Sequence, residues 1–245
     1  MQDYTQDYLL NRKVTIFQPT DGYRASTDAV MVSSLVHKVK RGDLILDVGS
    51  GTGAISLCLA ARFAALQPQI TGLELQPRLA ELANISAEYN GFATFLHYYN
   101  CDIKNKTDFI RHGSFQHVIS NPPYTDHDMP SPNISKALAH NHSGFDLSQW
   151  MDFCLKMLAP QGMFYMINRA EAVDEILYCA HGRLGNLMII PLFTKAQKQA
   201  KRVMVIGKKA SKTPTVILPQ FTVHDGDGYT AKAYGILREG KSFFD

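Results

Sequence analysis

Short apolar runs alternate with longer amphipathic segments along most of the chain. The apolar runs are five or six residues long and are bounded by glycine or polar residues, which is typical of strands buried in a parallel sheet. They cover residues 44–48, 70–75, 95–99, 115–119 and 162–167. The segments between them have helical spacing and cover residues 54–65, 77–90, 147–158 and 171–180. The pattern therefore predicts repeated strand–helix units.

Such alternation predicts an α/β protein with a doubly wound, mostly parallel sheet, whose ligands bind at the carboxyl ends of the strands. Two further apolar runs, residues 187–193 and 202–206, are joined by a lysine-rich loop and are expected to close the sheet with an antiparallel last strand. We expect residues 43–210 to form this core. Residues 1–42 are expected to be a lead-in that carries a helix, and residues 211–245 a tail.

The composition agrees with one globular core. The chain has 245 residues, of which 45% are hydrophobic and 19% charged. No apolar run approaches the roughly 20 residues that span a bilayer, and the N-terminus lacks the basic and apolar regions of a signal peptide. The four cysteines are scattered and form no C-x-x-C pair. These features predict a cytoplasmic protein with reduced thiols and no membrane partner.

Positive charge is concentrated in one part of the chain. No Asp or Glu occurs from Ile176 to His224, and eight of the 25 Lys and Arg residues lie there, so the remainder is net acidic. A local potential of this kind favours binding of a polyanion such as RNA. The residues that we expect to contact RNA phosphates are Lys195, Lys198, Lys201 and Arg202.

A glycine-rich loop follows the first predicted strand of the core, with Gly49, Gly51 and Gly53 after Asp47. This spacing suits a dinucleotide as well as S-adenosylmethionine. Asp47 separates the two, because a carboxylate at this strand end would repel a pyrophosphate but attract the ammonium and sulfonium groups of S-adenosylmethionine. The glycines would let the backbone approach the methionine part of the donor. We therefore expect S-adenosylmethionine as the cofactor.

Acidic residues follow the next two strands, where the rest of this cofactor would lie. Glu74 is about 20 residues beyond the loop and can accept hydrogen bonds from the two ribose hydroxyls. Asp102 can accept from the adenine amine, or alternatively cap a helix that starts at Ile103. Leu75 and Ile103 are expected to line the same site.

The stretch Asn121-Pro122-Pro123-Tyr124 follows the fourth strand and carries the most specific chemistry in the chain. The Asn121 side-chain oxygen and the Pro122 carbonyl can accept hydrogen bonds from an NH₂ group whose lone pair is delocalised. These bonds would turn the lone pair toward a methyl donor without full deprotonation. The prolines fix the loop shape, and Tyr124 offers a flat face for a stacked base. The stretch predicts catalysis of N-methylation at a planar amine.

Together, the glycine loop, Glu74, Asp102 and the Asn-Pro-Pro-Tyr stretch resemble the class I S-adenosylmethionine-dependent methyltransferases of the N6-adenine and N5-glutamine group, a Rossmann-like family. Within that group, the short lead-in and the basic C-terminal part are most similar to the bacterial tRNA1(Val) (adenine-37-N6)-methyltransferases. The resemblance implies methylation of an exocyclic adenine amine, with tRNA as the partner. It also implies that Thr27 and Asp28 help to close over the donor, although Ser26 or Thr27 could instead cap a helix over residues 28–36.

Proteins with other functions could have the same methyltransferase core. Alternative acceptors are guanine N2 in rRNA, a protein glutamine amide and a DNA adenine, but the enzymes for the last two usually carry extra domains that roughly 45 preceding residues do not accommodate. A non-catalytic RNA-binding protein with a vestigial donor site is a further alternative. The long loop 125–148 holds His127, His140 and His142, and we expect no metal there because methyl transfer needs none.

Overall fold

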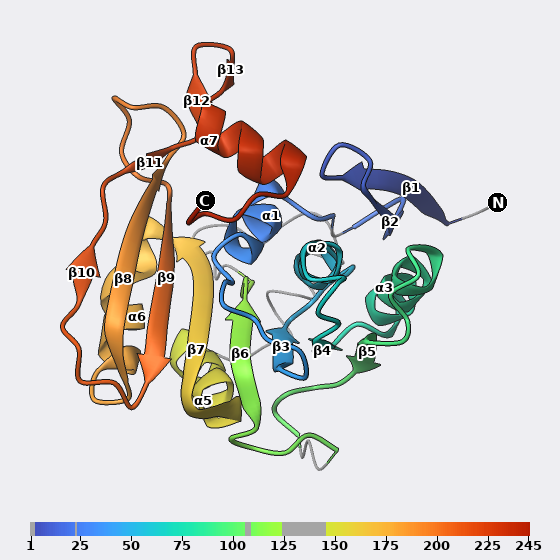
Figure 1. The fold of residues 1–245 in the computed structure, drawn as a ribbon, viewed down its shortest axis with the longest axis horizontal. Coiled ribbons are helices and arrows are strands. Elements are labelled where there is room, and N and C mark those ends of the chain that lie inside the picture. Colours follow the sequence, from blue (N-terminus) through green and yellow to red (C-terminus); the bar gives the residue numbers. More distant parts are fainter. Residues whose placement is uncertain (1–2, 23, 106–108, 124–145) are drawn as a thin grey trace.

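A nine-stranded sheet forms the centre of the computed structural model, which describes residues 3–22, 24–105, 109–123 and 146–245 (Figure 1). Its strands follow the order β10-β8-β9-β7-β6-β3-β4-β5, and β11 also pairs with β8. The parallel strands are β3 (Leu44–Val48), β4 (Gln69–Glu74), β5 (Leu96–Asn100), β6 (Phe115–Ser120) and β7 (Leu158–Arg169). β9 (Arg202–Lys209) runs antiparallel between β7 and β8 (Leu184–Phe193). The predicted doubly wound, mostly parallel sheet with an antiparallel closing strand is confirmed.

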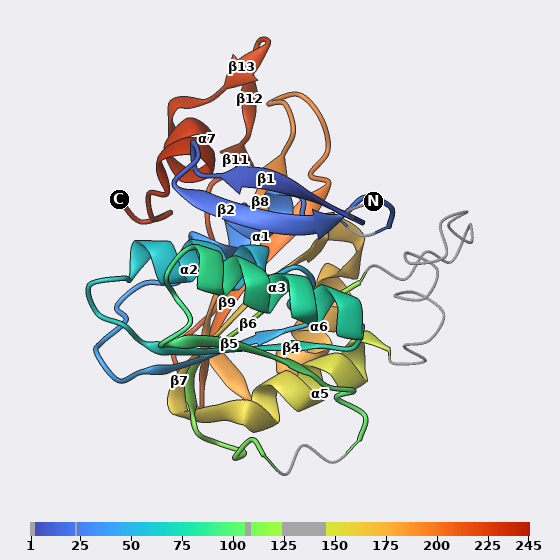
Figure 2. The same ribbon diagram turned by 90° about the vertical axis from the view of Figure 1, so that its right-hand side faces the viewer.

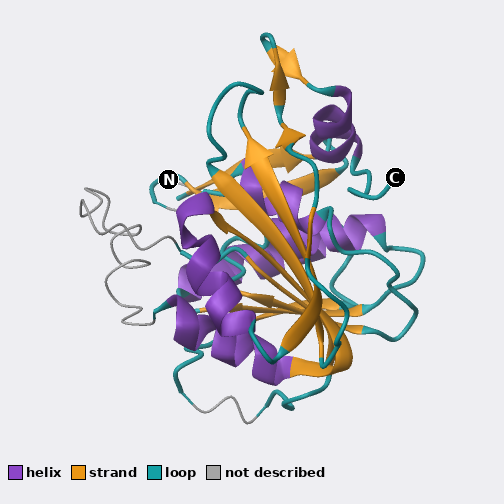
Figure 3. Cartoon of the chain, turned by 90° about the vertical axis from the view of Figure 1, so that its left-hand side faces the viewer, coloured by secondary structure: helices purple, strands orange, loops and turns teal. Residues whose placement is uncertain are grey.

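Helices cover both faces of this sheet (Figures 2 and 3). One face carries α1 (Thr27–Ser33), α2 (Ala54–Arg62) and α3 (Pro77–Tyr89), and the other carries α5 (Leu147–Met157) and α6 (Val173–Ala180). Successive side chains of a strand point to opposite faces, so neighbours in one strand enter different cores. In β3, Ile45 packs on the α1–α3 side and Leu46 on the α5–α6 side.

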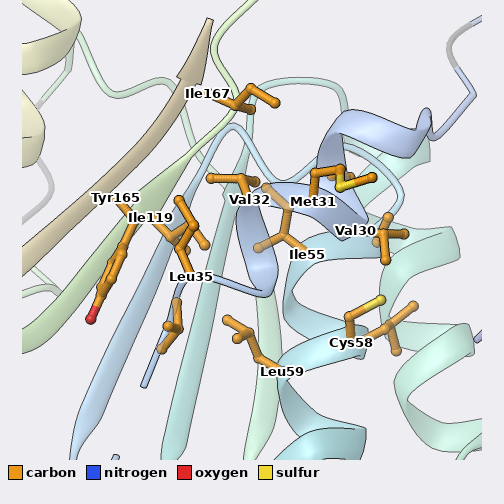
Figure 4. Packing of buried hydrophobic residues seen from close by; sticks show 14 of the residues in the cluster. Val30, Met31, Val32, Leu35, Ile55, Cys58, Leu59, Ile119, Tyr165 and Ile167 are labelled. Atoms are coloured by element: carbon orange, nitrogen blue, oxygen red, sulfur yellow. The ribbon is translucent and has the colours of Figure 1, made fainter. Parts of the chain in front are cut away.

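The core beneath α1 and α2 holds these helices on the sheet (Figure 4). Val32 of α1, Leu35 just beyond it and Ile55 of α2 belong to one buried cluster with Ile119 and Tyr165 of the sheet. Burial of an aliphatic side chain contributes about 1.5–3 kcal/mol. Because α2 starts directly after the glycine-rich loop, this packing also fixes the end of that loop.

The residues before the core form a β-hairpin that the hydrophobic pattern did not predict. β1 (Tyr4–Leu9) and β2 (Val14–Pro19) pair antiparallel in a separate two-stranded sheet. The hairpin is fastened to α3, since the Phe17 N–H donates to Ser86 Oγ at 2.9 Å. Residues 14–18 are all buried, polar Thr15 and Gln18 included, so β2 lacks the alternation of buried and exposed positions that marks a half-exposed strand.

The tail adds small elements beside β8 and over α1. They are β10 (Val216–Ile217), β11 (Phe221–Thr222), β12 (His224–Asp225), β13 (Gly228–Tyr229), α7 (Ala231–Tyr234) and η2 (Gly235–Glu239). β10 and β11 pair with β8 in parallel, whereas β12 and β13 form a hairpin. The chain then turns back, and the Phe243 N–H donates to the Ser34 carbonyl at 2.9 Å. The tail thus packs against the end of α1.

Several predicted elements differ in extent: α2 ends at Arg62 and not at residue 65, α6 starts at Val173, and β8 and β9 are each three residues longer than expected. The helix expected over residues 28–36 ends at Ser33, and Ser26 at its N-cap makes no side-chain capping bond. The strand expected over residues 162–167 is longer, because β7 pairs with β6 on one side and with β9 on the other. No helix in the described part of the chain combines the length and the apolar surface that crossing a bilayer requires. The division into residues 1–42, 43–210 and 211–245 stays a prediction.

Candidate active site

The carboxyl edge of the sheet brings the predicted site residues into one row. Because β5, β4, β3, β6 and β7 are parallel neighbours, their last residues lie side by side. Along the edge the order is Asp102 after β5, Glu74, the glycine loop after β3, Asn121 after β6, Arg169 and, at the start of β9, Arg202. We call the ends of β3, β4 and β5 the glycine-loop side and the ends at β7 and β9 the arginine side. Asn121 lies between them.

The glycine loop, residues 49–53, is shaped by close packing. Gly49 has a φ of +74°, and a Cβ on it would lie 2.8 Å from the Trp150 ring. Gly53 has a φ of +88°, and a Cβ there would lie 2.4 Å from the Tyr98 hydroxyl, which donates to the Gly53 carbonyl at 3.1 Å. Only glycine combines such backbone angles with such close approach. Trp150 and Tyr98 therefore hold the loop, a role that the sequence analysis missed because it depends on tertiary contacts.

Asp47 lies beneath the loop and is completely buried. Its Oδ2 accepts a hydrogen bond from Ser56 Oγ of α2 at 2.5 Å. Burial raises the pKa of Asp47 to about 7, against the lowering effect of that hydrogen bond. The side chain thus anchors the loop to α2. Its attraction for the cationic groups of the donor stays a prediction.

Glu74 holds the loop from the end of β4. Its Oε2 accepts from the Gly51 N–H and its Oε1 from the Gln76 N–H, both at 2.8 Å. Burial raises the pKa of the Glu74 carboxyl. Each carboxylate oxygen has two lone pairs, so these bonds are compatible with additional bonds from two ribose hydroxyls. That ribose contact stays a prediction.

The remaining residues predicted for the adenine end lie just beyond β4 and β5. Leu75 exposes 40% of its surface, whereas Ile103 is partly buried against the α5–α6 core. Asp102 Oδ1 accepts from the Lys104 N–H at 3.0 Å. Residues 103–105 form a turn and not a helix, so the alternative that Asp102 caps a helix at Ile103 is wrong. Its bond to the adenine amine stays a prediction.

Three buried polar atoms at the loop have no protein partner among the described residues. They are Asp47 Oδ1, Ser50 Oγ and Thr52 Oγ1. An unsatisfied buried polar atom costs about 1–3 kcal/mol, so a cluster of them marks a place for water or a ligand. The ammonium, carboxylate and hydroxyl groups of S-adenosylmethionine match a carboxylate, two hydroxyls and a backbone of glycine N–H groups. The residues present fit this cofactor.

Hydrogen bonds fix the residue before Asn121. Ser120 Oγ donates to the Val48 carbonyl at the end of β3 at 2.8 Å. Trp150 Nε1, from α5, donates to Ser120 Oγ at 2.9 Å. Because the Trp150 ring also packs on Gly49, one side chain connects α5, the glycine loop and the start of the Asn-Pro-Pro segment.

A shallow, open cleft lies beside the Asn-Pro-Pro segment. Its lining comes from that segment, from the first turns of α5 and α6, and from the end of β7. The lining residues include Pro122, Pro123, Asp146, Trp150, Asn168, Arg169 and Glu175. Tyr124 and the three loop histidines lie outside the described residues. The stacking role of Tyr124 and the expectation that no metal binds therefore stay predictions.

Asp28 and Arg202, which were predicted for different tasks, form an ion pair. Arg202 Nε lies 2.9 Å from Asp28 Oδ2, and both side chains are mostly buried. The pair fastens the start of α1 to the start of β9, while Thr27 beside it is exposed. The predicted roles of Thr27 and Asp28 at the donor, and of Arg202 at RNA, stay predictions.

The basic stretch is divided between the two ends of the β8–β9 pair. The loop that joins these strands at the carboxyl edge holds Lys195, Lys198 and Lys201. Lys208 and Lys209 lie at the opposite end of β9, roughly 20 Å away at 3.3 Å per residue. Lys209 Nζ donates to the carbonyls of Leu155 and Leu158, both at 2.7 Å, and so closes the end of α5. One charge run in the sequence is thus two patches in space, and the predicted RNA contacts belong to the patch at the carboxyl edge.

Known proteins are similar to this chain in sequence over most of its length. The family model of the methyltransferase small domain matches residues 25–145, which include the glycine loop, Glu74, Asp102 and Asn121. The tRNA1(Val) (adenine(37)-N6)-methyltransferase of Porphyromonas gingivalis is 26% identical, covering 93% of this chain and 92% of its own. The enzymes of that name from Actinobacillus pleuropneumoniae and Shewanella baltica are 27% and 28% identical, covering 90% and 89% of this chain and 90% and 92% of their own.

Solved structures support the fold. A predicted O-methyltransferase from Agrobacterium tumefaciens has a TM-score of 0.71 at 24% identity, covering 88% of this chain and 97% of its own. Geranyl diphosphate C-methyltransferase from Streptomyces coelicolor, solved with S-adenosyl-L-homocysteine, has a TM-score of 0.52 at 13% identity, covering 74% and 78%. The fold, the family match and the fit of the glycine-loop side lead to one assignment: this chain is a Rossmann-like class I methyltransferase that uses S-adenosylmethionine.

Proposed function

We propose that this methyltransferase transfers a methyl group to the exocyclic N6 amine of an adenine in tRNA. The observation that carries the proposal is the place of Asn121. It directly follows β6, whose neighbour β3 ends at the glycine loop, so an amide oxygen stands next to the donor side of the sheet edge. The relatives whose names state this reaction match about nine-tenths of the chain, which supports the same substrate.

The residues that would hold the donor come from α1 and from the ends of β3, β4 and β5. They are Thr27, Asp28, Asp47, Gly49, Gly51, Gly53, Glu74, Leu75, Asp102 and Ile103, and Asn121 after β6 would also contact the donor. S-adenosylmethionine supplies an electrophilic methyl group on its sulfonium. Glu74 would accept from the ribose hydroxyls and Asp102 from the adenine amine, with Leu75 as an apolar wall. Ordering these groups before the acceptor arrives lowers the entropic cost of the reaction.

The Asn-Pro-Pro segment acts on the acceptor. Asn121 Oδ1 and the Pro122 carbonyl would accept hydrogen bonds from the two N6 protons and turn the nitrogen lone pair out of conjugation with the ring. Neither oxygen is a strong base, so the proton leaves to water only after the new N–C bond has made the nitrogen cationic. Tyr124, two residues beyond Pro122, would stack on the base. The chemistry of this segment requires no metal.

RNA would reach the segment from the arginine side. Lys195, Lys198 and Lys201 in the loop between β8 and β9, with Arg202, are placed at the same sheet edge as Asn121 and would contact phosphates. Such contacts persist in ground and transition states alike, so they govern substrate affinity and not the chemical step.

Transfer of a tritiated methyl group tests the proposal. The purified protein is incubated with labelled donor and, separately, with bulk tRNA, rRNA, DNA or protein, and the labelled product is digested to nucleosides or amino acids. We expect N6-methyladenosine from tRNA, and incorporation of label slower by on the order of 10²–10³ with the Asn121→Ala variant. Label in guanosine of rRNA or in glutamine would overturn the substrate assignment in favour of those acceptors. Donor binding with no turnover on any polymer would identify a non-catalytic binding protein.

A further inference from the structure

The paired part of β3 and β6 ends where the two halves of the reaction centre begin. Val48 and Ser120 are the last register partners of these strands. Gly49, the first residue of the glycine loop, and Asn121 each come one residue later, so they leave the sheet next to each other. Two side chains, those of Ser120 and Trp150, join the two strands at this point.

The Ser120 hydroxyl is the centre of this connection. It donates to the Val48 carbonyl at 2.8 Å and accepts from Trp150 Nε1 at 2.9 Å. Ser120 is completely buried, so its hydroxyl does not exchange these bonds for bonds to bulk water. The Trp150 ring also lies so close to Gly49 that a Cβ there would be 2.8 Å from it. One indole thus packs on the donor loop and bonds to the residue that precedes Asn121.

The same indole borders the acceptor side, since Trp150 lines the cleft beside the Asn-Pro-Pro segment. It is carried by α5, whose start is fixed by a capping box. Asp146 Oδ1 accepts from the Gln149 N–H at 2.8 Å, and Gln149 Oε1 accepts from the Asp146 N–H at 3.3 Å. Met151 and Cys154 of the same helix are completely buried in the α5–α6 core. Trp150 therefore stands on a rigid element, and its contacts are in place before either substrate binds.

We propose that Trp150 and Ser120 are positioning residues for methyl transfer, which hold the glycine loop and Asn121 at a fixed separation so that the bound methyl group meets the acceptor nitrogen. This inference rests on the proposed function, in which Asn121 binds the acceptor amine. The two residues act through Gly49 and Asn121 and need not touch the reacting atoms. Because a displacement of about 1 Å between reacting groups costs about 10²-fold in rate, contacts that set this separation act on kcat.

Ser120→Ala is the decisive variant, because it removes both hydrogen bonds of the hydroxyl and retains the indole. We expect kcat, at saturating donor and tRNA, to fall about tenfold, whereas KM for tRNA and the Kd of S-adenosylmethionine change less than about threefold. Trp150→Phe removes the same N–H and shortens the ring on Gly49, so it should lower kcat at least as much and also weaken donor binding. The double variant should have about the kcat of Trp150→Phe alone, because both substitutions break one hydrogen bond.

Tyr165→Phe is the matched control for the loss of a buried hydroxyl. It removes the hydrogen bond that Tyr165 shares with His117 Nδ1 at 3.2 Å, in the first half of β6 and away from the carboxyl edge. Thermal melts are recorded for all four variants, and kcat is measured at a temperature at which each is fully folded. We expect Ser120→Ala and Tyr165→Phe both to lower the melting temperature, but only Ser120→Ala to lower kcat.

Three results would contradict the positioning role. They are a kcat of Ser120→Ala equal to that of Tyr165→Phe, a loss of donor affinity in Ser120→Ala larger than its loss of kcat, and losses of kcat that multiply in the double variant. If Ser120→Ala does not fold, Ser120→Cys fills the same space with a weaker hydrogen-bonding group and should have a kcat between those of wild type and Trp150→Phe.

Methyl transfer to tRNA by the wild type tests the proposed function separately. An active wild type with an unchanged kcat in Ser120→Ala refutes the positioning role alone. If the wild type methylates another acceptor, the proposed substrate is wrong, and the same comparison of variants is made on that acceptor. A wild type that methylates no acceptor would overturn both proposals.

Discussion

On the glycine-loop side of the sheet edge, polar groups are buried and hydrogen-bonded, whereas on the arginine side the lysines of the loop between β8 and β9 are exposed. Asp47 and Glu74 are almost fully buried and bond to Ser56 and to the Gly51 N–H. The lysines between β8 and β9 are exposed or nearly so. The difference follows the two partners: a small cofactor fits a rigid pocket, but a long polyanion is bound by many separate, screened charges.

This contrast predicts that substitutions on the two sides have different effects. A change on the glycine-loop side removes interactions that also hold α2 and the sheet together, so it should lower the free energy of unfolding. A change to a lysine in the loop between β8 and β9, on the arginine side, removes a solvent-exposed charge and should alter only RNA affinity. Asn121, between the two sides, should affect the chemical step alone.

Asn121→Ala is expected to give the largest effect. Loss of one preorganised acceptor lowers kcat by on the order of 10²–10³, because the bond is strongest where the nitrogen becomes tetrahedral. Donor affinity and melting temperature should stay close to wild type. Single-turnover transfer to tRNA measures the effect. A variant with near wild-type kcat would remove Asn121 from the mechanism.

Asp47→Asn should change how stability depends on pH. The pKa of Asp47 is about 7 in the folded protein and about 3.8 when unfolded, so the folded state binds more protons between these values. The free energy of unfolding of the wild type should therefore decrease as pH rises from 4 to 7, by on the order of 2–4 kcal/mol from this group. The variant should lose that part of the slope, as seen in urea titrations at several pH values. Asp225→Asn, at an exposed position, should retain it.

Gly49→Ala tests the close packing of the glycine loop against Trp150. The new Cβ would lie 2.8 Å from the Trp150 ring at a φ of +74°. Strain and overpacking together should cost about 1–3 kcal/mol and weaken donor binding. Gly91→Ala is the matched control, because Gly91 has the same φ of +74° but nothing within 4 Å of the new Cβ. Equal melting temperatures for the two variants would show that the contact with Trp150 is unimportant.

The smallest effect is expected on the arginine side, from the pair Lys195→Gln and Lys198→Gln. Each lost phosphate contact should weaken tRNA binding a few-fold and flatten its salt dependence by about 0.7–0.9. Donor affinity and unfolding should be unaffected. Filter binding across a salt series measures this, with Lys208→Gln and Lys212→Gln as the equally charged control at the other end of β9. Coincident curves for both pairs would refute the assignment of the loop to RNA.

The parts of the fold that the sequence predicted are those set by local pattern. Leu44–Val48 was predicted to the residue because an apolar run ends there at a glycine loop, and the start of α3 follows from Pro77. The row of site residues could also be predicted, because the carboxyl ends of parallel strands lie at one edge of the sheet. The hairpin of β1 and β2 was not predicted, because β2 is buried on both sides.

Contacts between distant elements set the rest of the site. Nothing near Tyr98 or Trp150 in the sequence indicates that their rings fit against Gly53 and Gly49. The pairing of Asp28 with Arg202 joins residues 174 positions apart, and the division of the basic stretch depends on where β8 turns into β9. These features depend on register and packing, which a single sequence does not encode in a local pattern.

The indole of Trp150 is also an optical probe that the chain already contains. It is the only tryptophan of the 245 residues, and it lies on Gly49 of the glycine loop while its Nε1 bonds to Ser120, next to Asn121. Emission from an indole depends on the polarity and hydrogen bonding around it. Intrinsic fluorescence at an excitation selective for tryptophan therefore reports from one known point between donor and acceptor. Stopped-flow mixing with either partner can thus order the binding steps without any label.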